Sequence, residues 1–448
     1  MFNKYIVAAS NIMYHYMKPQ AESESFTRYQ IVMIAVLAFI QFTVILDFMV
    51  IAPLGALLMN TLGISPAQFG WVVSAYAFSA GASGLLAAGF ADRYDRKRLL
   101  LFFYTGFLLG TLLCGMAPGF HFLLIARIVT GLFGGVIASV SLAIVTDLFP
   151  YEMRSRVMGF VQMSFAGSQV LGIPLGISLA NAFGWHAPFL LIFIIGTCAG
   201  FVIAKVVRPI NHHLQAGIAL ERKAFEHLTK TLAHAHYRKA FAATGLLTVG
   251  GFLMMPFSTT FLVNNVAISQ AQLPLVFVLT GIATMVILPV VGRLSDMLGK
   301  FRIFVIGTAL ASVTIVFFTH LSVSPVWEII IVNIFLFAGL MSRMVPATAM
   351  MTAVPATGDR GAFMSVSSSL QQISGGVASI VAGAIIIQHA SRGPLENYDL
   401  LGYLCVASMI LGAGMLYSIH RYVEGKLRSG TRGMPGEGDN PSPRLPET

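Results

Sequence analysis

The sequence predicts an all-α membrane protein in which twelve transmembrane helices form two pseudo-symmetric six-helix bundles. Of its 448 residues, 56% are hydrophobic and only 10% are charged, whereas soluble domains carry about 25% charged residues. Apolar runs of about 20 residues, the length that crosses the hydrocarbon core of a bilayer, recur along the chain. Charged loops that repeat at a fixed interval indicate that the second half duplicates the first.

The evidence for this duplication is a pair of charged loops, around Asp92 and Asp296. Each lies between two apolar runs, so each must form a turn at the membrane surface, because charged side chains are excluded from hydrocarbon. A basic residue, Arg96 or Lys300, stands four positions after each aspartate. One interval therefore aligns both residues of the first loop with both residues of the second, as in a chain built from a repeated unit.

Twelve apolar spans follow one another along the chain, at about 31–58, 68–91, 99–118, 122–147, 157–181, 187–206, 240–264, 273–292, 302–320, 327–353, 362–388 and 400–420. They predict an N-terminal bundle at 31–206 and a C-terminal bundle at 240–421. The remaining segments are expected to be cytoplasmic: an arm at 1–30, a linker with a surface helix at 207–239 and a disordered tail at 422–448.

The basic residues indicate how the chain is oriented. The formal net charge is +10, but all Lys and Arg residues other than Arg127, Arg343 and Arg392 fall on the side of the termini. By the positive-inside rule, this distribution predicts a multi-pass protein of the inner (plasma) membrane with both termini in the cytoplasm. The orientation of the chain in the membrane therefore explains the excess of positive charge. We expect no nucleic-acid partner.

Motifs for metal, cofactor or enzyme chemistry are missing from the sequence. The three cysteines fall in apolar spans, and the histidines of the linker lack the spacing of a tight metal site. No glycine-rich phosphate loop ending in Gly-Lys-Ser or Gly-Lys-Thr is present, so ATP is not the expected energy source. We therefore expect no metal, no cofactor and no enzymatic activity.

Asp47 in the first span is the most informative single residue. Counted from Ile31 at about 1.5 Å per residue, it lies about 24 Å from the start of the helix, deep in the membrane. It is the only carboxylate predicted at that depth. An ionised carboxylate there is costly unless it is paired or protonated, so such residues face a bundle interior or a water-filled path. Asp47 is either a structural partner of an arginine or a protonation site.

Arg127 in the fourth span is the candidate partner of Asp47. This helix runs back from the opposite side of the membrane, which brings Arg127 to a depth within reach of Asp47. Burial favours the neutral acid and a nearby guanidinium favours the carboxylate, so breaking the pair would change how tightly Asp47 holds a proton. The two residues are therefore candidates for proton coupling.

Together these features resemble the major facilitator superfamily, and in particular its twelve-helix branch of proton-coupled drug and metabolite efflux proteins. The loop from Asp92 to Arg98, the segment from Leu46 to Pro53 and Arg127 match patterns of that family. Three features depart from it. The loop has Asp95 and Ala88 where the family usually has glycines, and the fifth span has only a degenerate form of the antiporter pattern around Pro174. The resemblance covers residues 31–421.

The resemblance also implies a cytoplasmic gate. Asp92 would lie near the start of the eleventh helix, where the helix dipole favours an anion. Arg96 would bridge to Asp147 at the end of the fourth helix and latch the two halves together when the protein opens outward. Asp296 is the second copy of Asp92.

Arg343, deep in the span 327–353, needs a partner because an unpaired arginine in hydrocarbon is very costly. The partner could be a backbone carbonyl freed by Pro346, Asp47 across the cavity or an anionic substrate. Further polar residues could line a central cavity or form hydrogen bonds between helices. These are Gln162, Gln169, Asn333, Gln371 and Gln372.

The function expected from the resemblance is proton-coupled efflux of an amphipathic small molecule by alternating access between the two bundles. Two deep arginines against one deep carboxylate favour an anionic or zwitterionic substrate. The expected partners are this substrate, protons and membrane lipid, with the chain acting as a monomer. Two alternatives stay open: a proton-independent facilitator or importer, including one for a lipid-like substrate, and a non-transporting membrane receptor.

Overall fold

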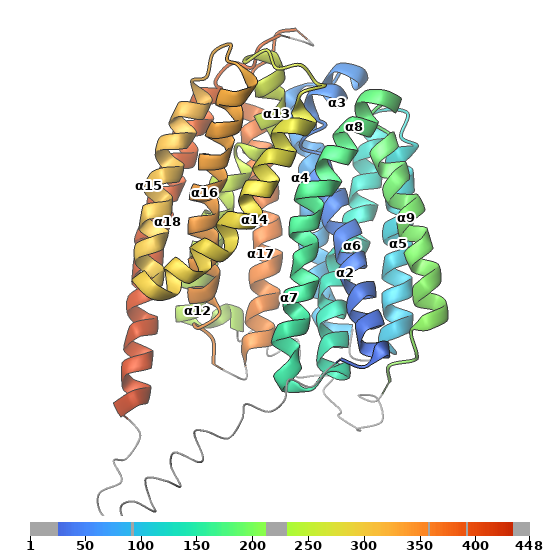
Figure 1. The fold of residues 1–448 in the computed structure, drawn as a ribbon, viewed down its shortest axis with the longest axis vertical. Helices are drawn as coiled ribbons and strands as arrows, with labels where there is room; N and C mark the ends of the chain where they lie inside the picture. The colour runs from blue at the N-terminus through green and yellow to red at the C-terminus, as the bar shows by residue number, and fades with distance from the viewer. Residues whose placement is uncertain (1–25, 91–93, 212–230, 357–358, 391–392, 433–448) are drawn as a thin grey trace, which may run out of the picture.

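The computed structural model describes residues 26–90, 94–211, 231–356, 359–390 and 393–432. Within these ranges the chain consists of long helices joined by short loops, and its one pairing of extended segments is an isolated β-bridge. Both α2, which begins near the N-terminus, and α18, which ends near the C-terminus, reach the lower end of the bundle in Figure 1. We call this the termini end and the other the opposite end.

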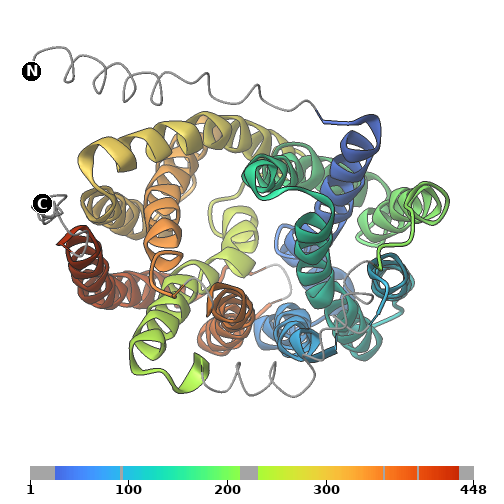
Figure 2. The ribbon, with the colours of Figure 1, turned by 90° about the horizontal axis from the view of Figure 1, so that it is seen from below.

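The N-terminal half contains six membrane crossings, two of them broken. Its elements are α2 (Arg28–Val50), α3 (Gly55–Leu62), α4 (Pro66–Phe90), α5 (Arg96–Gly115), α6 (Phe120–Leu148), α7 (Tyr151–Gly167), the π-helical turn η2 (Ser168–Gly172), α8 (Ile173–Phe183) and α9 (Ala187–Val206). Seen from below, these helices fill one side of the molecule (Figure 2).

The C-terminal half fills the other side of the molecule (Figure 2). It also contains six crossings. Its elements are α12 (Ala235–Phe252), α13 (Met255–Asn264), α14 (Leu273–Leu298), α15 (Lys300–Thr319), α16 (Val326–Met351), α17 (Arg360–Ile385) and α18 (Tyr398–Arg432). Eleven helical segments of the described chain are long and apolar enough to span a membrane. The twelfth crossing is α17, which has the length but is rich in serine, glycine and glutamine. The predicted all-α fold of about twelve helices is confirmed.

The first helix of each half is broken, whereas the sequence predicted single spans at 31–58 and 240–264. In the N-terminal half, residues 51–54 form turns between α2 and α3. Pro53 explains this break, because proline lacks an N–H group and disfavours helical geometry at the residue before it. In the C-terminal half, α13 begins with Pro256 in its first turn, a position that proline favours.

The fifth crossing differs from its prediction in a similar way. The sequence predicted a single span at 157–181, but the structure has a π-helical turn, η2, that ends two residues before Pro174. The N–H of Ile173 donates to the Ser168 carbonyl, which is the wider spacing of a π-turn. Because Pro174 has no N–H group to continue the α-helical ladder, the extra residue is accommodated there.

The predicted ends of the chain and its linker are tested only in part. Helix α18 continues to Arg432, past the predicted start of the disordered tail at 422. The predicted arm at 1–30 and the surface helix of the linker lie mostly outside the described residues.

The buried hydrophobic residues form one core that joins the halves and two that do not. The joint core lies at the opposite end and includes Leu58 and Phe69 from the N-terminal half with Phe257 and Phe261 from the C-terminal half. Toward the termini end, the buried residues of one core all come from 33–210, and those of another all come from 237–419. The halves therefore share one core at the opposite end, whereas at the termini end each has its own buried core, and Leu85 of α4 packs against that of the C-terminal half.

Helices α4 and α17 form the closest contact between the halves. Ser74 donates a hydrogen bond to the Gly376 carbonyl at 2.7 Å, from one half to the other. A Cβ atom built on Gly70 would lie 2.7 Å from the Ser379 carbonyl oxygen, so only glycine permits this approach. The contact fixes α4, which carries one wall of the site described next.

Candidate functional site

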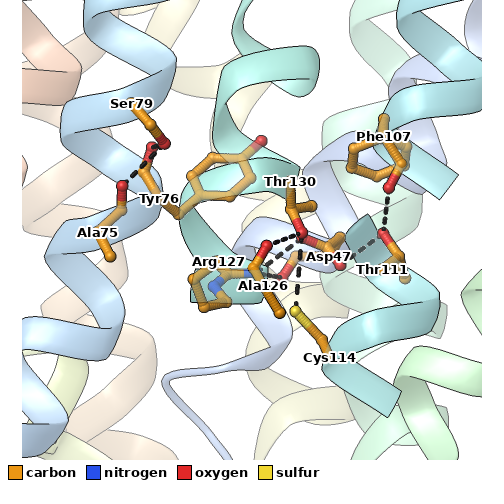
Figure 3. A network of polar contacts seen from close by, with 10 residues as sticks. All are labelled: Asp47, Ala75, Tyr76, Ser79, Phe107, Thr111, Cys114, Ala126, Arg127 and Thr130. Atoms are coloured by element: carbon orange, nitrogen blue, oxygen red, sulfur yellow. Dashed lines mark hydrogen bonds and ion pairs between the residues drawn. The ribbon is translucent and has the colours of Figure 1, made fainter. Parts of the chain in front are cut away.

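An ion pair between Asp47 on α2 and Arg127 on α6 lies at the centre of the N-terminal half. Arg127 Nη1 donates to Asp47 Oδ2 at 2.8 Å, and both side chains are fully buried. Thr111 on α5 donates to the other carboxylate oxygen, Oδ1, at 3.1 Å. Figure 3 shows these residues converging from three helices. The contact predicted from helix depths is present.

Only one of the three guanidinium nitrogens of Arg127, Nη1, binds the Asp47 carboxylate. Its Nε and Nη2 have no hydrogen-bond partner among the described residues. Its Cζ lies 4.5 Å from the centre of the Tyr76 ring on α4, a cation–π distance (Figure 3). Arg127 is thus held by a carboxylate on one side and an aromatic face on another.

Small residues bring the helices close enough for this geometry. A Cβ atom on Gly110 of α5 would lie 2.6 Å from Thr130 Oγ1 on α6. A Cβ atom on Gly134 of α6 would lie 2.8 Å from the Tyr76 hydroxyl. Substituting either glycine would force the helices or side chains apart, so the close packing of α4, α5 and α6 positions the ion pair.

A pocket lies between the two halves beside the ion pair. Its walls come from α2, α4, α6 and α17, and its lining residues are Gln41, Val44, Ile45, Phe48, Tyr76, Ala80, Gly84, Gly134, Gly135, Ala138, Ser139, Ser365, Ser368, Ser369 and Gln372. Among the described residues that line it, none is charged. Amide and hydroxyl groups share the surface with two aromatic rings, which is typical of small-molecule sites.

Of the described polar residues predicted to line a cavity, Gln372 is the one that lines this pocket. Its neighbour Gln371 is exposed on α17. Gln169 is buried in η2. Asn333 donates to a carbonyl one turn back in its own helix, α16, at 3.0 Å. Gln162 lies in α7, and its side chain is outside the described set.

Arg343 lies inside the C-terminal half and not on the pocket lining. Its Nε donates to Thr308 on α15 at 3.2 Å, and its Cζ lies 5.7 Å from the centre of the Phe304 ring. The partner is therefore neither Asp47 nor a carbonyl freed by Pro346, which corrects both expectations. A contact with substrate stays a prediction that would require another conformation.

The gate residues are only partly brought together. Arg96 Nε donates to Asp147 Oδ2 at 3.1 Å, as the resemblance implied. Both residues belong to the N-terminal half, on α5 and α6, so this pair by itself does not latch one half to the other. Asp92 lies outside the described residues, and Asp296 is exposed near the end of α14. A latch between the halves would therefore depend on Asp92.

Asp95, which replaces the usual glycine of the loop, has a role that the sequence interpretation missed. One carboxylate oxygen caps α5 by accepting from the Arg98 N–H at 2.9 Å. The other accepts from the Ile210 N–H at 2.8 Å, and so ties α5 to the segment after α9. An aspartate directly before a helix is an ordinary N-cap signal. Placing the start of this helix at 99 instead of Arg96 hid it.

The comparison with known families follows from this fold and site. The family model described as Major Facilitator Superfamily matches residues 37–379 and 240–443. The chain belongs to the major facilitator superfamily. It is therefore an integral, multi-pass membrane protein of a transporter family.

Relatives within the superfamily include a multidrug resistance protein. The uncharacterized MFS-type transporter YceJ of Bacillus subtilis (strain 168) is 27% identical over 274 residues, covering 60% of this chain and 68% of that protein. Multidrug resistance protein 3 of the same organism is 33% identical over 146 residues, covering 33% of this chain and 28% of that protein. A bacterial homolog of the human lysosomal transporter Spinster, solved in an inward-facing and occupied conformation, has a TM-score of 0.67 at 16% identity, covering 89% of this chain and 98% of that one.

Proposed function

We propose that this major facilitator protein exports an amphipathic small molecule in exchange for protons, and that Asp47 carries the proton. The observation that carries the proposal is the fully buried Asp47–Arg127 pair beside a pocket between the halves. The drug resistance named for Multidrug resistance protein 3, a relative over 33% of this chain, agrees with export of a small molecule.

The chemistry of the pair suits proton exchange. An ionised carboxylate stays buried in the membrane only while a cation compensates it, and a protonated one can stay buried alone. A movement that separates Arg127 from Asp47 would therefore make Asp47 take up a proton, and restoring the pair would release it. Arg127 has N–H groups to spare for a second arrangement, because its Nε and Nη2 are unpartnered among the described residues.

The packing of the halves supports alternating access. They share a core at the opposite end and have separate cores at the termini end. Rocking the halves about the pocket would open one end as it closes the other. In this proposal the termini are cytoplasmic, so the shared core closes the outer side, as in the state in which an exporter takes up its substrate from inside.

The pocket also bears on the charge of the substrate. The expected preference for an anion or zwitterion rested on Arg127 and Arg343, and neither lines the pocket. Its amide, hydroxyl and aromatic groups suit an uncharged portion of the substrate. We therefore propose that the part of the molecule seated in the pocket is neutral.

Transport by protein reconstituted in liposomes, with a pH dye inside, tests the proposal. A panel of amphipathic neutral, cationic and anionic compounds is added to the wild type and to Asp47→Asn under an imposed proton gradient. We expect certain compounds to drive proton movement in the wild type and none to do so in Asp47→Asn. Asp399→Asn, which changes an exposed carboxylate in the first turn of α18, is the matched control.

A proton-independent facilitator is the second candidate, because a buried ion pair can serve only to hold two helices together. In that case compounds would cross without moving protons in the wild type, and Asp47→Asn would lose stability but the folded fraction would still transport. Such a result would reject proton exchange at Asp47 while leaving the pocket as the substrate site.

A further inference from the structure

Tyr76 is the one described residue that both lines the pocket and contacts the guanidinium of Arg127. Its ring lies 4.5 Å from Arg127 Cζ, and the residue also forms part of the pocket wall (Figure 3). The ring is only 2% exposed and is held by neighbours from two other helices. Phe48, which directly follows Asp47, packs against it with ring centres 5.2 Å apart. The hydroxyl group lies beside Gly134.

This position separates the substrate space from the ion pair. Asp47 and Arg127 have no exposed side-chain surface, although Phe48 and Tyr76 on the same wall face the pocket. A molecule in the pocket contacts these rings and can act on the pair through them. Tyr76 is the one that contacts Arg127 directly, so its placement affects how the guanidinium is held.

We infer that Tyr76 couples an uncharged aromatic substrate in the pocket to the protonation of Asp47. While Arg127 is paired with the Asp47 carboxylate, the Tyr76 ring packs on the guanidinium and leaves the pocket open to substrate. When Asp47 takes up a proton and Arg127 moves, the ring loses this support and turns into the pocket. A substrate seated against the ring holds it on Arg127, which keeps the pair closed and Asp47 ionised. The inference rests on the proton exchange proposed above.

Substrate binding and protonation of Asp47 oppose each other in this arrangement, as an exchanger requires. Because coupling between two sites is reciprocal, a substrate that favours ionised Asp47 must bind more weakly once Asp47 is protonated. Three other groups with titratable or charged side chains surround the carboxylate or its partner: Arg127 on α6, Tyr76 on α4 and Cys114 on α5. Ordinary thiols, phenols and guanidinium groups titrate above about pH 8. In the proposal, Asp47 is therefore the group of this set that exchanges the proton.

Binding of dansylamide, a fluorescent aromatic sulfonamide that is uncharged from about pH 5.5 to about pH 8, tests the inference in detergent-solubilised protein. Typical couplings between two sites correspond to about 5- to 150-fold in affinity. We expect the wild-type Kd to rise by a factor in this range as the pH falls. The quantity to compare is the ratio of Kd at the lower pH to Kd at the higher pH. Tyr76→Phe keeps the ring and should keep the wild-type ratio. Tyr76→Leu should have a ratio of at most about two, whatever its absolute affinity for dansylamide.

Tyr104→Leu is the matched control for loss of a buried aromatic ring. Tyr104 hydrogen-bonds Thr43, one turn before Asp47 on α2, and does not line the pocket. It should keep the wild-type ratio of Kd values. If Tyr76→Leu also keeps that ratio, or if dansylamide fails to bind the wild type, the inference is overturned. If the wild-type Kd is independent of pH, as in Asp47→Asn, the proposed proton exchange fails together with it.

Discussion

The two halves share one architecture but differ in the chemistry buried inside them. Each has a broken first helix and a buried arginine deep in its fourth crossing, Arg127 or Arg343. The N-terminal half supplies a carboxylate, Asp47, four residues before the end-cap of α2. The corresponding position before the end-cap of α12 is Val249. The duplication has therefore kept the scaffold in both halves and placed the acid in one.

The two buried arginines therefore differ in what they contact. Arg127 forms a full ion pair in contact with a pocket-lining ring, so its state can respond to what the pocket holds. Arg343 has a neutral hydroxyl, that of Thr308, as its hydrogen-bond partner, and its Nη2 is unpartnered among the described residues. The comparison supports the proposal that exchange takes place in the N-terminal half, while the C-terminal half completes the pocket through α17.

Removing Arg127 should have the largest effect on stability. Arg127→Met leaves a buried carboxylate without its cation, and breaking a buried pair in this way costs about 3–5 kcal/mol. Chemical unfolding in mixed micelles measures this loss. The double variant Asp47→Leu with Arg127→Met removes both charges and should recover most of the loss. A double variant as unstable as the single one would show that packing, and not charge, holds this region.

Packing between α5 and α6 should have the next largest effect. Gly110→Ala places a methyl group 2.6 Å from Thr130 Oγ1, and overpacking of this kind costs about 1–3 kcal/mol. The same unfolding measurement checks it. Gly251→Ala in α12 of the other half is the control, because a Cβ atom there meets nothing within 4 Å. Equal losses in both variants would contradict the tight packing around the ion pair.

The hydrogen bond to Asp47 should contribute less. Thr111→Val keeps the shape of the side chain but removes the donor to Asp47 Oδ1, and hydrogen bonds to charged groups contribute about 1.5–3 kcal/mol. Because Arg127 still compensates the carboxylate, we expect a loss at the lower end of this range. Substrate-driven proton movement in liposomes should persist at an altered pH optimum. An unchanged pH profile would show that this donor does not tune the carboxylate.

The features that could be predicted from the sequence are those that depend on depth in the membrane. Apolar runs and charged loops fixed the number of crossings, and counting residues from the helix ends brought Asp47 and Arg127 to one level. What failed depends on which way a side chain faces around its helix. Thr308 was not among the partners considered for Arg343, and Tyr76 was not singled out at all.

Rotation about a helix axis is hard to predict here because hydrophobicity surrounds every side of a transmembrane helix. In a soluble helix an apolar stripe marks the buried face, but lipid and protein interior are equally apolar. The facing of Tyr76 is decided by close approaches at glycines such as Gly134, which depend on several helices at once. The local breaks at Pro53 and around Pro174 were visible as prolines, but their forms, a pair of turns and a π-turn, depend on packing.

The smallest effect is expected at Arg343, and it sharpens the contrast between the halves. Arg343→Met replaces a buried charge that has no carboxylate partner among the described residues with an apolar side chain of similar length. Because desolvation of a buried charge is costly, such replacements are often neutral or stabilising. We expect little change in unfolding free energy and unchanged proton movement per substrate. Loss of transport with normal stability would instead show that Arg343 meets the substrate in another conformation, and the C-terminal half would then also carry a functional charge.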